Sequence, residues 1–258
     1  MDTQGPPRFG GKIWLGLATL LAIGSMVAVI RPVRKLAPLP APTTPRPDKR
    51  KLVNRLLNAR QRAKRWLPGR ALRARLAPLY RTVFLWVSGY RGAVADLVQQ
   101  LVQSDDSVLD VGTGQGLIAL AAARIAQRVD ATDSSGQAID KGWALAARSG
   151  RSVTFRQAPA TALPYPDNHF SLVLSGLLLL ALPRSWRQQV LQEIYRVLQP
   201  GGRIAFFIGP AELGAVPMPE SQWQRFVARA GFVSVQVDHP QSLFPLLRAR
   251  KPWPEKTV

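Results

Sequence analysis

The sequence predicts an α/β fold, and two segments indicate it. Residues 108–116 (VLDVGTGQG) surround one acid with apolar residues and then place three glycines at alternate positions. This is the pattern of a buried strand that ends in a tight turn. The apolar run 117–123 follows at once and suits the start of a helix packed on a sheet. A strand, a glycine turn and a helix in this order form a unit that cradles a nucleotide.

A second strand that ends in an acid is expected at residues 129–133 (VDATD). Asp133 lies 21 residues after Gly112, near the offset of about 20 residues at which a carboxylate meets ribose hydroxyls in nucleotide-binding folds. A helix is expected from about Gly136, so one of residues 133–135 is also expected to cap it. The two roles are compatible, because one residue can cap the helix while Asp133 binds a ribose.

The glycine turn does not match the patterns that bind phosphates. A dinucleotide fingerprint would need a glycine at position 117, where this chain has Leu117, and no G-x-x-x-x-G-K-[ST] sequence is present. Asp110, directly before the turn, would repel a pyrophosphate. The pattern D-x-G-x-G-x-G therefore suits a ligand that has no phosphate and carries an amino group.

With these residues the chain resembles the class I S-adenosylmethionine-dependent methyltransferases, over roughly residues 90–252. Segments 158–175, 196–207 and 222–250 resemble, in order, the adenine-side loop with the fourth strand, the Pro-Gly-Gly turn with the fifth strand, and the last helix with the terminal strands. The resemblance implies a Rossmann-like, seven-stranded, mostly parallel sheet with helices on both faces, and S-adenosyl-L-methionine as cofactor. The residues that it places at the cofactor are Asp110, Gly112, Thr113, Gly114, Gln115, Gly116, Asp133, Ser134 and Ala160.

Two positions depart from the resembled family. Pro159 stands where the family usually has an acid that accepts from the adenine amino group, and a proline has neither a carboxylate nor an N–H. The backbone N–H of Ala160 is then the remaining donor to the ring. Ser171 replaces a common Asp, a change expected to cost little. With Pro159 at this position, the sequence predicts the identity of the cofactor but not how tightly it binds.

A membrane anchor is predicted near the N-terminus. Residues 13–30 form an uncharged apolar run between Lys12 and Arg31, which would span about 27 Å as a helix. A cleaved signal peptide would have a shorter apolar region and a small-residue cleavage site, which the run lacks. Because more Lys and Arg follow the run than precede it, the catalytic domain is expected on the cytoplasmic side, with the tail of residues 1–12 outside.

The positive charge is concentrated between the predicted anchor and the catalytic domain. Residues 1–91 carry 19 Lys and Arg and 2 acids, a net charge of +17, whereas residues 92–258 carry 16 and 13, a net charge of +3. A Pro-rich linker is predicted at 31–48, a basic helical region at 49–89 and a methyltransferase-like domain at 90–258. The interpretation favoured for residues 49–75 is binding to an anionic membrane surface. A nucleic-acid clamp and a solvated helix on the catalytic fold are the alternatives.

The chemistry of the acceptor is less well defined by the sequence. The chain has no cysteine, which excludes disulfides and thiolate sites, and His169 is expected in a surface turn. The apolar run 175–182 after the fourth strand suits a small hydrophobic acceptor, although plain core packing would give the same pattern. Three hypotheses follow: methyl transfer to a lipophilic, membrane-associated molecule, a catalytically inactive membrane-anchored scaffold, and membrane-tethered RNA methylation. No catalytic base is assigned.

Overall fold

The computed structural model describes residues 89–208, 219–239 and 244–254, all within one compact unit of the chain that spans residues 47–258. The predictions for residues 13–30, 31–48 and 49–75 lie outside these ranges. Among the helices that are described, none has the length and apolar character needed to cross a bilayer.

Seven strands form one sheet in the order β3-β2-β1-β4-β5-β7-β6. Strands β1 to β5 run parallel to one another, while β7 runs antiparallel to both β5 and β6. The strands are β1 (Ser107–Val111), β2 (Arg128–Asp133), β3 (Thr154–Gln157), β4 (Phe170–Ser175), β5 (Leu198–Phe207), β6 (Val233–Asp238) and β7 (Leu246–Arg250). The seven-stranded, mostly parallel sheet predicted from the sequence is confirmed.

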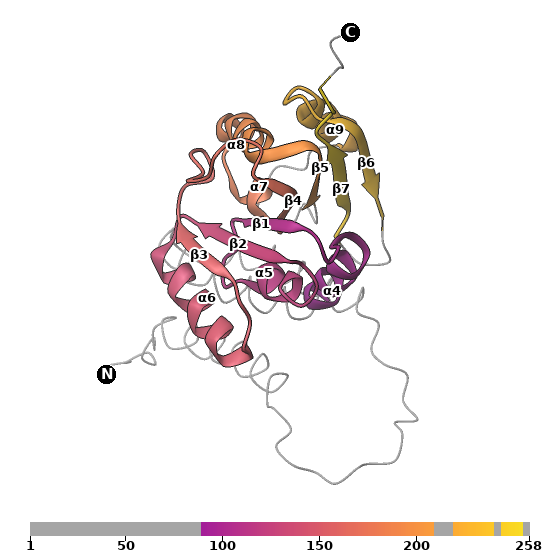
Figure 1. Cartoon of the computed structure of the whole chain (residues 1–258). Coiled ribbons are helices and arrows are strands. Elements are labelled where there is room, and N and C mark those ends of the chain that lie inside the picture. Colours follow the sequence, from indigo (N-terminus) through magenta and orange to yellow (C-terminus); the bar gives the residue numbers. More distant parts are fainter. Residues whose placement is uncertain (1–88, 209–218, 240–243, 255–258) are drawn as a thin grey trace, which may run out of the picture. The chain divides into compact units, whose positions relative to one another are not determined.

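Helices cover both faces of the sheet, with α4, α5 and α6 on one face and α7, α8 and α9 on the other (Figure 1). Their bounds are α4 (Tyr90–Leu101), α5 (Leu117–Ala122), α6 (Gly136–Ser149), α7 (Leu178–Ala181), α8 (Arg184–Val197) and α9 (Glu220–Ala228). The helix expected after the glycine turn is therefore only six residues long.

The two faces of the sheet bury separate apolar clusters because side chains alternate along each strand. Leu109, Val173 and Ile204 lie in register on neighbouring strands and pack toward α8. One residue further along, Asp110 lies in register with Leu174 and Ala205 on the α4 side. A carboxylate is thus built into an otherwise apolar row of the core.

The Pro-Gly-Gly segment lies inside a strand. The sequence predicts a helix end, a turn and then a strand over residues 196–207, but α8 ends at Val197 and β5 begins at Leu198. The pairing of β4 with β5 shifts between Phe170 and Leu172, so residues 200–202 form an irregularity in the ladder. The backbone of Lys251 bonds to Gly201 and Gly202, which gives this segment the partners of a strand.

Candidate functional site

The glycine turn between β1 and α5 has the predicted conformation. Gly112, Gly114 and Gly116 have φ values of 69°, 57° and 84°. Residues that have a Cβ atom rarely adopt this left-handed region. A Cβ atom on Gly112 would lie 2.9 Å from Leu178, and one on Gly116 would lie 2.9 Å from Phe155, but one on Gly114 would meet no atom within 4 Å. The turn therefore packs closely at its two ends and is open at its centre.

Asp110 holds the turn from below. Its Oδ2 atom accepts hydrogen bonds from the hydroxyl of Thr113 (2.6 Å) and the backbone N–H of Ala119 (3.1 Å), so one carboxylate fixes both the turn and the first turn of α5. The side chain is buried, and its Oδ1 atom has no hydrogen-bond partner. Burial raises the pKa of Asp110 to about 7, against the two hydrogen bonds that lower it, and the nearby Asp133 raises it further.

Tyr90, the first residue of α4, lies in the same region, although no sequence pattern assigned it to the site. A Cβ atom on Gly176 would lie 2.2 Å from its hydroxyl, so this glycine leaves room for the phenol. Burial, and then the charge of Asp110, raise the pKa of Tyr90. The phenol therefore stays protonated beside the ends of β1 and β4.

Asp133 lies at the end of β2, beside the glycine turn. Its Oδ2 atom accepts from the N–H of Gly114 and its Oδ1 atom from the N–H of Ser135, both at 2.9 Å. Ser135 caps α6 by accepting from the N–H of Ala138, so the predicted cap is present and does not use the Asp133 side chain predicted to bind a ribose. Each carboxylate oxygen has two lone pairs, and one on each remains free for a ligand hydroxyl.

A cleft opens at the carboxyl ends of the parallel strands. Four of the predicted cofactor residues line it: Gly112, Asp133, Ser134 and Ala160. The other five lie behind or beside it. Asp110 and Thr113 support the turn from the interior, Gly114 bonds to Asp133, Gln115 is exposed and Gly116 packs on Phe155. Ligands of open α/β folds bind at this end of the strands.

Pro159 also lines the cleft, together with Ala158 and Thr161. The carbonyl of Pro159 accepts from the N–H of Ala162 at 3.1 Å, so it closes a turn. The N–H of Ala160 has no hydrogen-bond partner in the described part of the chain. This N–H is therefore available to donate to a ring nitrogen of adenine, the role expected for it, although a donor does not replace the acceptor that a carboxylate would supply.

An ion pair on α8, which no sequence motif indicated, holds the loop that carries Pro159 and Ala160. Glu193 accepts from the N–H of Leu163, and Arg196 donates to the carbonyls of Leu163 and Tyr165. The two side chains also pair with each other at 2.8 Å. Arg196 thereby lowers the pKa of Glu193. An acid and a base three residues apart on a helix are ordinary in sequence, so nothing marked this pair.

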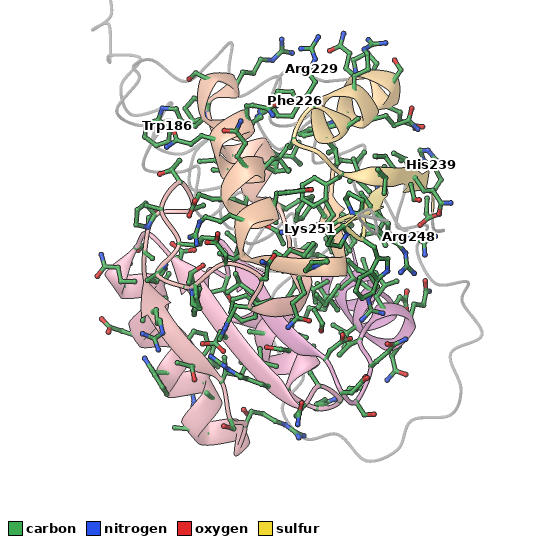
Figure 2. The ribbon with its side chains drawn as sticks, turned by 45° about the horizontal axis from the view of Figure 1, so that its top comes forward. Trp186, Phe226, Arg229, His239, Arg248 and Lys251 are labelled. Carbon is green, nitrogen blue, oxygen red and sulfur yellow. The ribbon has the colours of Figure 1, made fainter. Side chains whose placement is uncertain are left out.

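The opposite wall of the cleft is apolar. It consists of Leu178, Leu182, Trp186 and Val190, from α7, the connection after it and the start of α8. Trp186 has 54% of its surface exposed, and Figure 2 shows its side chain at the first turn of α8, outside the ribbon. The apolar run 175–182 thus contributes to both the core and the cleft, because Leu179 is buried while Leu178 and Leu182 line the cavity.

His169 does not line this cleft. Asn168 before it has a φ of 55°, and the N–H of His169 donates to the carbonyl of Val197. The turn predicted ahead of the fourth strand is present, and the imidazole stacks on Tyr165. Ser171 donates to Asp106 at 2.6 Å, and Asp106 also pairs with Arg203. The replacement of the usual acid by Ser171 is therefore accommodated by a polar network.

This geometry can be compared with known proteins. Residues 108–202 match the family model described as a methyltransferase domain. The match covers β1 to the start of β5, which includes the glycine turn, Asp133 and the loop of Pro159. The resemblance stated from the sequence is confirmed for this segment.

Relatives of known sequence match similar segments. A demethylmenaquinone methyltransferase from Deinococcus radiodurans is 34% identical over 146 residues, which are 53% of this chain and 58% of that protein. An uncharacterised protein of Mycobacterium tuberculosis is 31% identical over 141 residues, 51% of each chain. The matches span between 35% and 58% of the length of such curated relatives.

Solved structures share the fold. An S-adenosylmethionine-dependent methyltransferase from Aquifex aeolicus superposes with a TM-score of 0.52 at 19% identity, covering 61% of this chain and 89% of that one. The cyclase SpnF gives a TM-score of 0.55 at 22% identity, covering 63% and 81%. A cyclase among these structures means that the fold by itself does not specify the reaction.

Proposed function

We propose that this chain is an S-adenosylmethionine-dependent methyltransferase that acts on a small, lipophilic acceptor. The observation that carries the proposal is the convergence of Gly112 and Asp133 on one cleft at the carboxyl ends of β1 and β2. The methyltransferase-domain match over residues 108–202 and the methyltransferase relatives support it.

The residues of the cleft fit the proposed cofactor. The free lone pairs of Asp133 accept from the two ribose hydroxyls, while its bonds to Gly114 and Ser135 keep the carboxylate in place. The open centre of the glycine turn lets the backbone approach the methionine portion. Ala160 offers its N–H to the adenine ring.

When bound, S-adenosylmethionine would supply an electrophilic methyl group on its sulfonium, and the carbon–sulfur bond would break as the acceptor atom forms its bond to that methyl group. The protein then has to align the two molecules and exclude water. Asp110 and Thr113 keep the turn rigid, and the apolar wall of Leu178, Leu182 and Trp186 keeps the cleft poor in water. No general base is required when the acceptor atom is already nucleophilic.

The lipophilic acceptor is proposed from the apolar wall and from the relatives. Two of the relatives are named as quinone-pathway methyltransferases, from Deinococcus radiodurans and Geotalea daltonii. A membrane-associated acceptor also agrees with the predicted anchor at residues 13–30 and the predicted anionic-membrane contact of residues 49–75. We propose on that basis a single-pass membrane protein with its catalytic domain on the cytoplasmic side.

A catalytically inactive scaffold is the second candidate, and one observation favours it. Pro159 lines the cleft where an acid would hold the adenine amino group. Nothing in the described residues favours RNA methylation over these two.

Calorimetric titration of the full chain with S-adenosylmethionine, in lipid nanodiscs, tests the proposal. We expect saturable binding in the micromolar range, with competition by S-adenosylhomocysteine. No heat up to millimolar ligand would exclude the enzyme and leave the scaffold.

A further inference from the structure

Arg187, in the first turn of α8, is a buried cation that has no acidic partner among the described residues. Only 3% of its surface is exposed, and its Nη1 atom has no hydrogen-bond partner. No carboxylate of residues 89–208, 219–239 or 244–254 forms an ion pair with it. Arginine is rarely buried unless it is paired.

The contacts that Arg187 does make fix the position of its guanidinium. The Nε atom donates to the carbonyl of Leu182 at 3.1 Å, and the guanidinium lies over the ring of Trp223 from α9, 5.5 Å from its centroid. Burial, and then the positive charge of Arg184, lower the pKa of Arg187. The side chain is thus oriented by a neutral acceptor and an aromatic ring, and no carboxylate of the described residues neutralises its charge.

Arg187 is not itself a lining residue of the cleft, but it adjoins two residues that are. Leu182, whose carbonyl holds Arg187, lines the cavity, and so does Trp186, the residue before Arg187. Leu182 and Trp186 belong to the apolar wall, on the far side from the residues proposed to bind the cofactor. A group that binds Arg187 would therefore extend from the acceptor side of the cleft.

A guanidinium binds carboxylates and phosphates through a planar fork of donors. Retaining such a group where it is desolvated and unpaired disfavours the folded state, so a structural role alone does not explain the charge. A methionine or glutamine at this position would fill similar space without that cost.

We propose that Arg187 recognises an anionic group, a carboxylate or a phosphate ester, on the acceptor of the methyl group. The acceptor then combines an apolar body, which lies against Leu182 and Trp186, with one acidic group directed at α8. This inference rests on the proposed function, because it assigns the acceptor side of the same cleft.

Three probes of similar size test the inference on the full chain in nanodiscs of neutral lipid: benzoate, phenyl phosphate and benzyl alcohol. Binding is measured by ligand-observed NMR titration in the presence of S-adenosylhomocysteine. We expect at least one of the two anions to bind about tenfold more tightly than the alcohol, and the better anion identifies the acidic group. Arg187→Gln should abolish this preference, and Arg187→Lys, which keeps the charge without the fork, should retain part of it.

Arg184→Gln is the matched control, since it removes the same charge from an exposed position three residues away, and it should leave the preference intact. Arg187→Gln and Arg187→Met should change the Tm little, because losing the contacts of the guanidinium with Leu182 and Trp223 is offset by removing the cost of burying its charge. The inference is overturned if Arg187→Gln keeps the preference or if no anion is preferred. It is also overturned if Arg187→Gln and Arg187→Met both lose several degrees in Tm while Arg187→Lys shows no change in preference. A failure of the methyltransferase proposal is distinguishable, because it would appear as no binding of S-adenosylmethionine by the unchanged chain.

Discussion

The two walls of the cleft are built in different ways. The β1–β2 wall presents the backbone of the glycine turn and the carboxylate of Asp133, which are fixed by hydrogen bonds between residues at most 19 apart in sequence. The wall formed by Leu182, Trp186 and Val190 presents side chains that pack from a helix start. The first wall is a rigid polar cradle and suits a constant cofactor, whereas the second can change by substitution without disturbing the turn and suits a variable acceptor.

Asp133→Asn should have the largest effect on the cradle. The amide keeps one acceptor oxygen but loses the charge, and its NH₂ group faces a backbone N–H. Affinity for S-adenosylmethionine should fall about 30- to 100-fold, or about 2–3 kcal/mol. Calorimetry measures the loss, and Asp140→Asn, at an exposed position of α6, is the control. An unchanged affinity would contradict the assignment of Asp133 to the ribose.

Gly116→Ala and Gly114→Ala should separate folding from binding within the turn. At Gly116 the new methyl group would lie 2.9 Å from Phe155, so we expect a loss of about 2 kcal/mol or more in the free energy of unfolding. At Gly114 the space is open and only the left-handed backbone is strained, at a cost of about 1 kcal/mol. Urea unfolding measures both.

Gly114→Ala should nevertheless weaken the binding of the cofactor at least as much as Gly116→Ala does, because the new methyl group at position 114 enters the open centre of the turn. Equal losses of stability in the two variants would contradict this division of roles.

Asp110→Asn should change the pH dependence of stability. The pKa of Asp110 is raised in the folded protein to about 7, so the folded state holds a proton that the unfolded state has released between about pH 4 and pH 7. Asp110 therefore makes the protein less stable as the pH rises through this window. An asparagine keeps an oxygen acceptor and carries no charge, so the variant should be more stable than the unchanged protein by about 1 kcal/mol or more at pH 8. The difference should shrink toward pH 5, and urea unfolding at the two pH values measures it.

Pro159→Asp should have the smallest effect of these substitutions, and it should raise the affinity for S-adenosylmethionine where Asp133→Asn lowers it. Restoring an acid at this position supplies an acceptor for the adenine amino group, which should tighten S-adenosylmethionine binding about threefold to tenfold. Pro159→Ala is the control, because it restores the N–H without the carboxylate. An equal gain in affinity for Pro159→Asp and Pro159→Ala would show that the restored backbone N–H, and not the carboxylate, causes the effect.

The sequence predicted the polar wall well and the apolar wall only in part. The turn at 112–116, the carboxylate of Asp133 and the capping of α6 depend on interactions between residues 2 to 19 apart in sequence, within one strand–turn–helix–strand unit, and such a unit leaves a residue pattern. The clamp of Glu193 and Arg196 on the loop at 163–167 joins residues about 30 apart, and the burial of Arg187 depends on the approach of Trp223. Such approaches leave no local pattern, so these residues emerged only from the fold. The predicted membrane anchor and basic helix stay predictions.

A crystal structure of the complex with S-adenosylhomocysteine tests the central claim most directly. The account predicts that the two ribose hydroxyls lie within hydrogen-bond distance of the Asp133 carboxylate, with the adenine beside Ala160 and the methionine portion over Gly112 and Gly114. An adenosyl group bound elsewhere, or in this cleft with its ribose away from Asp133, would contradict the account.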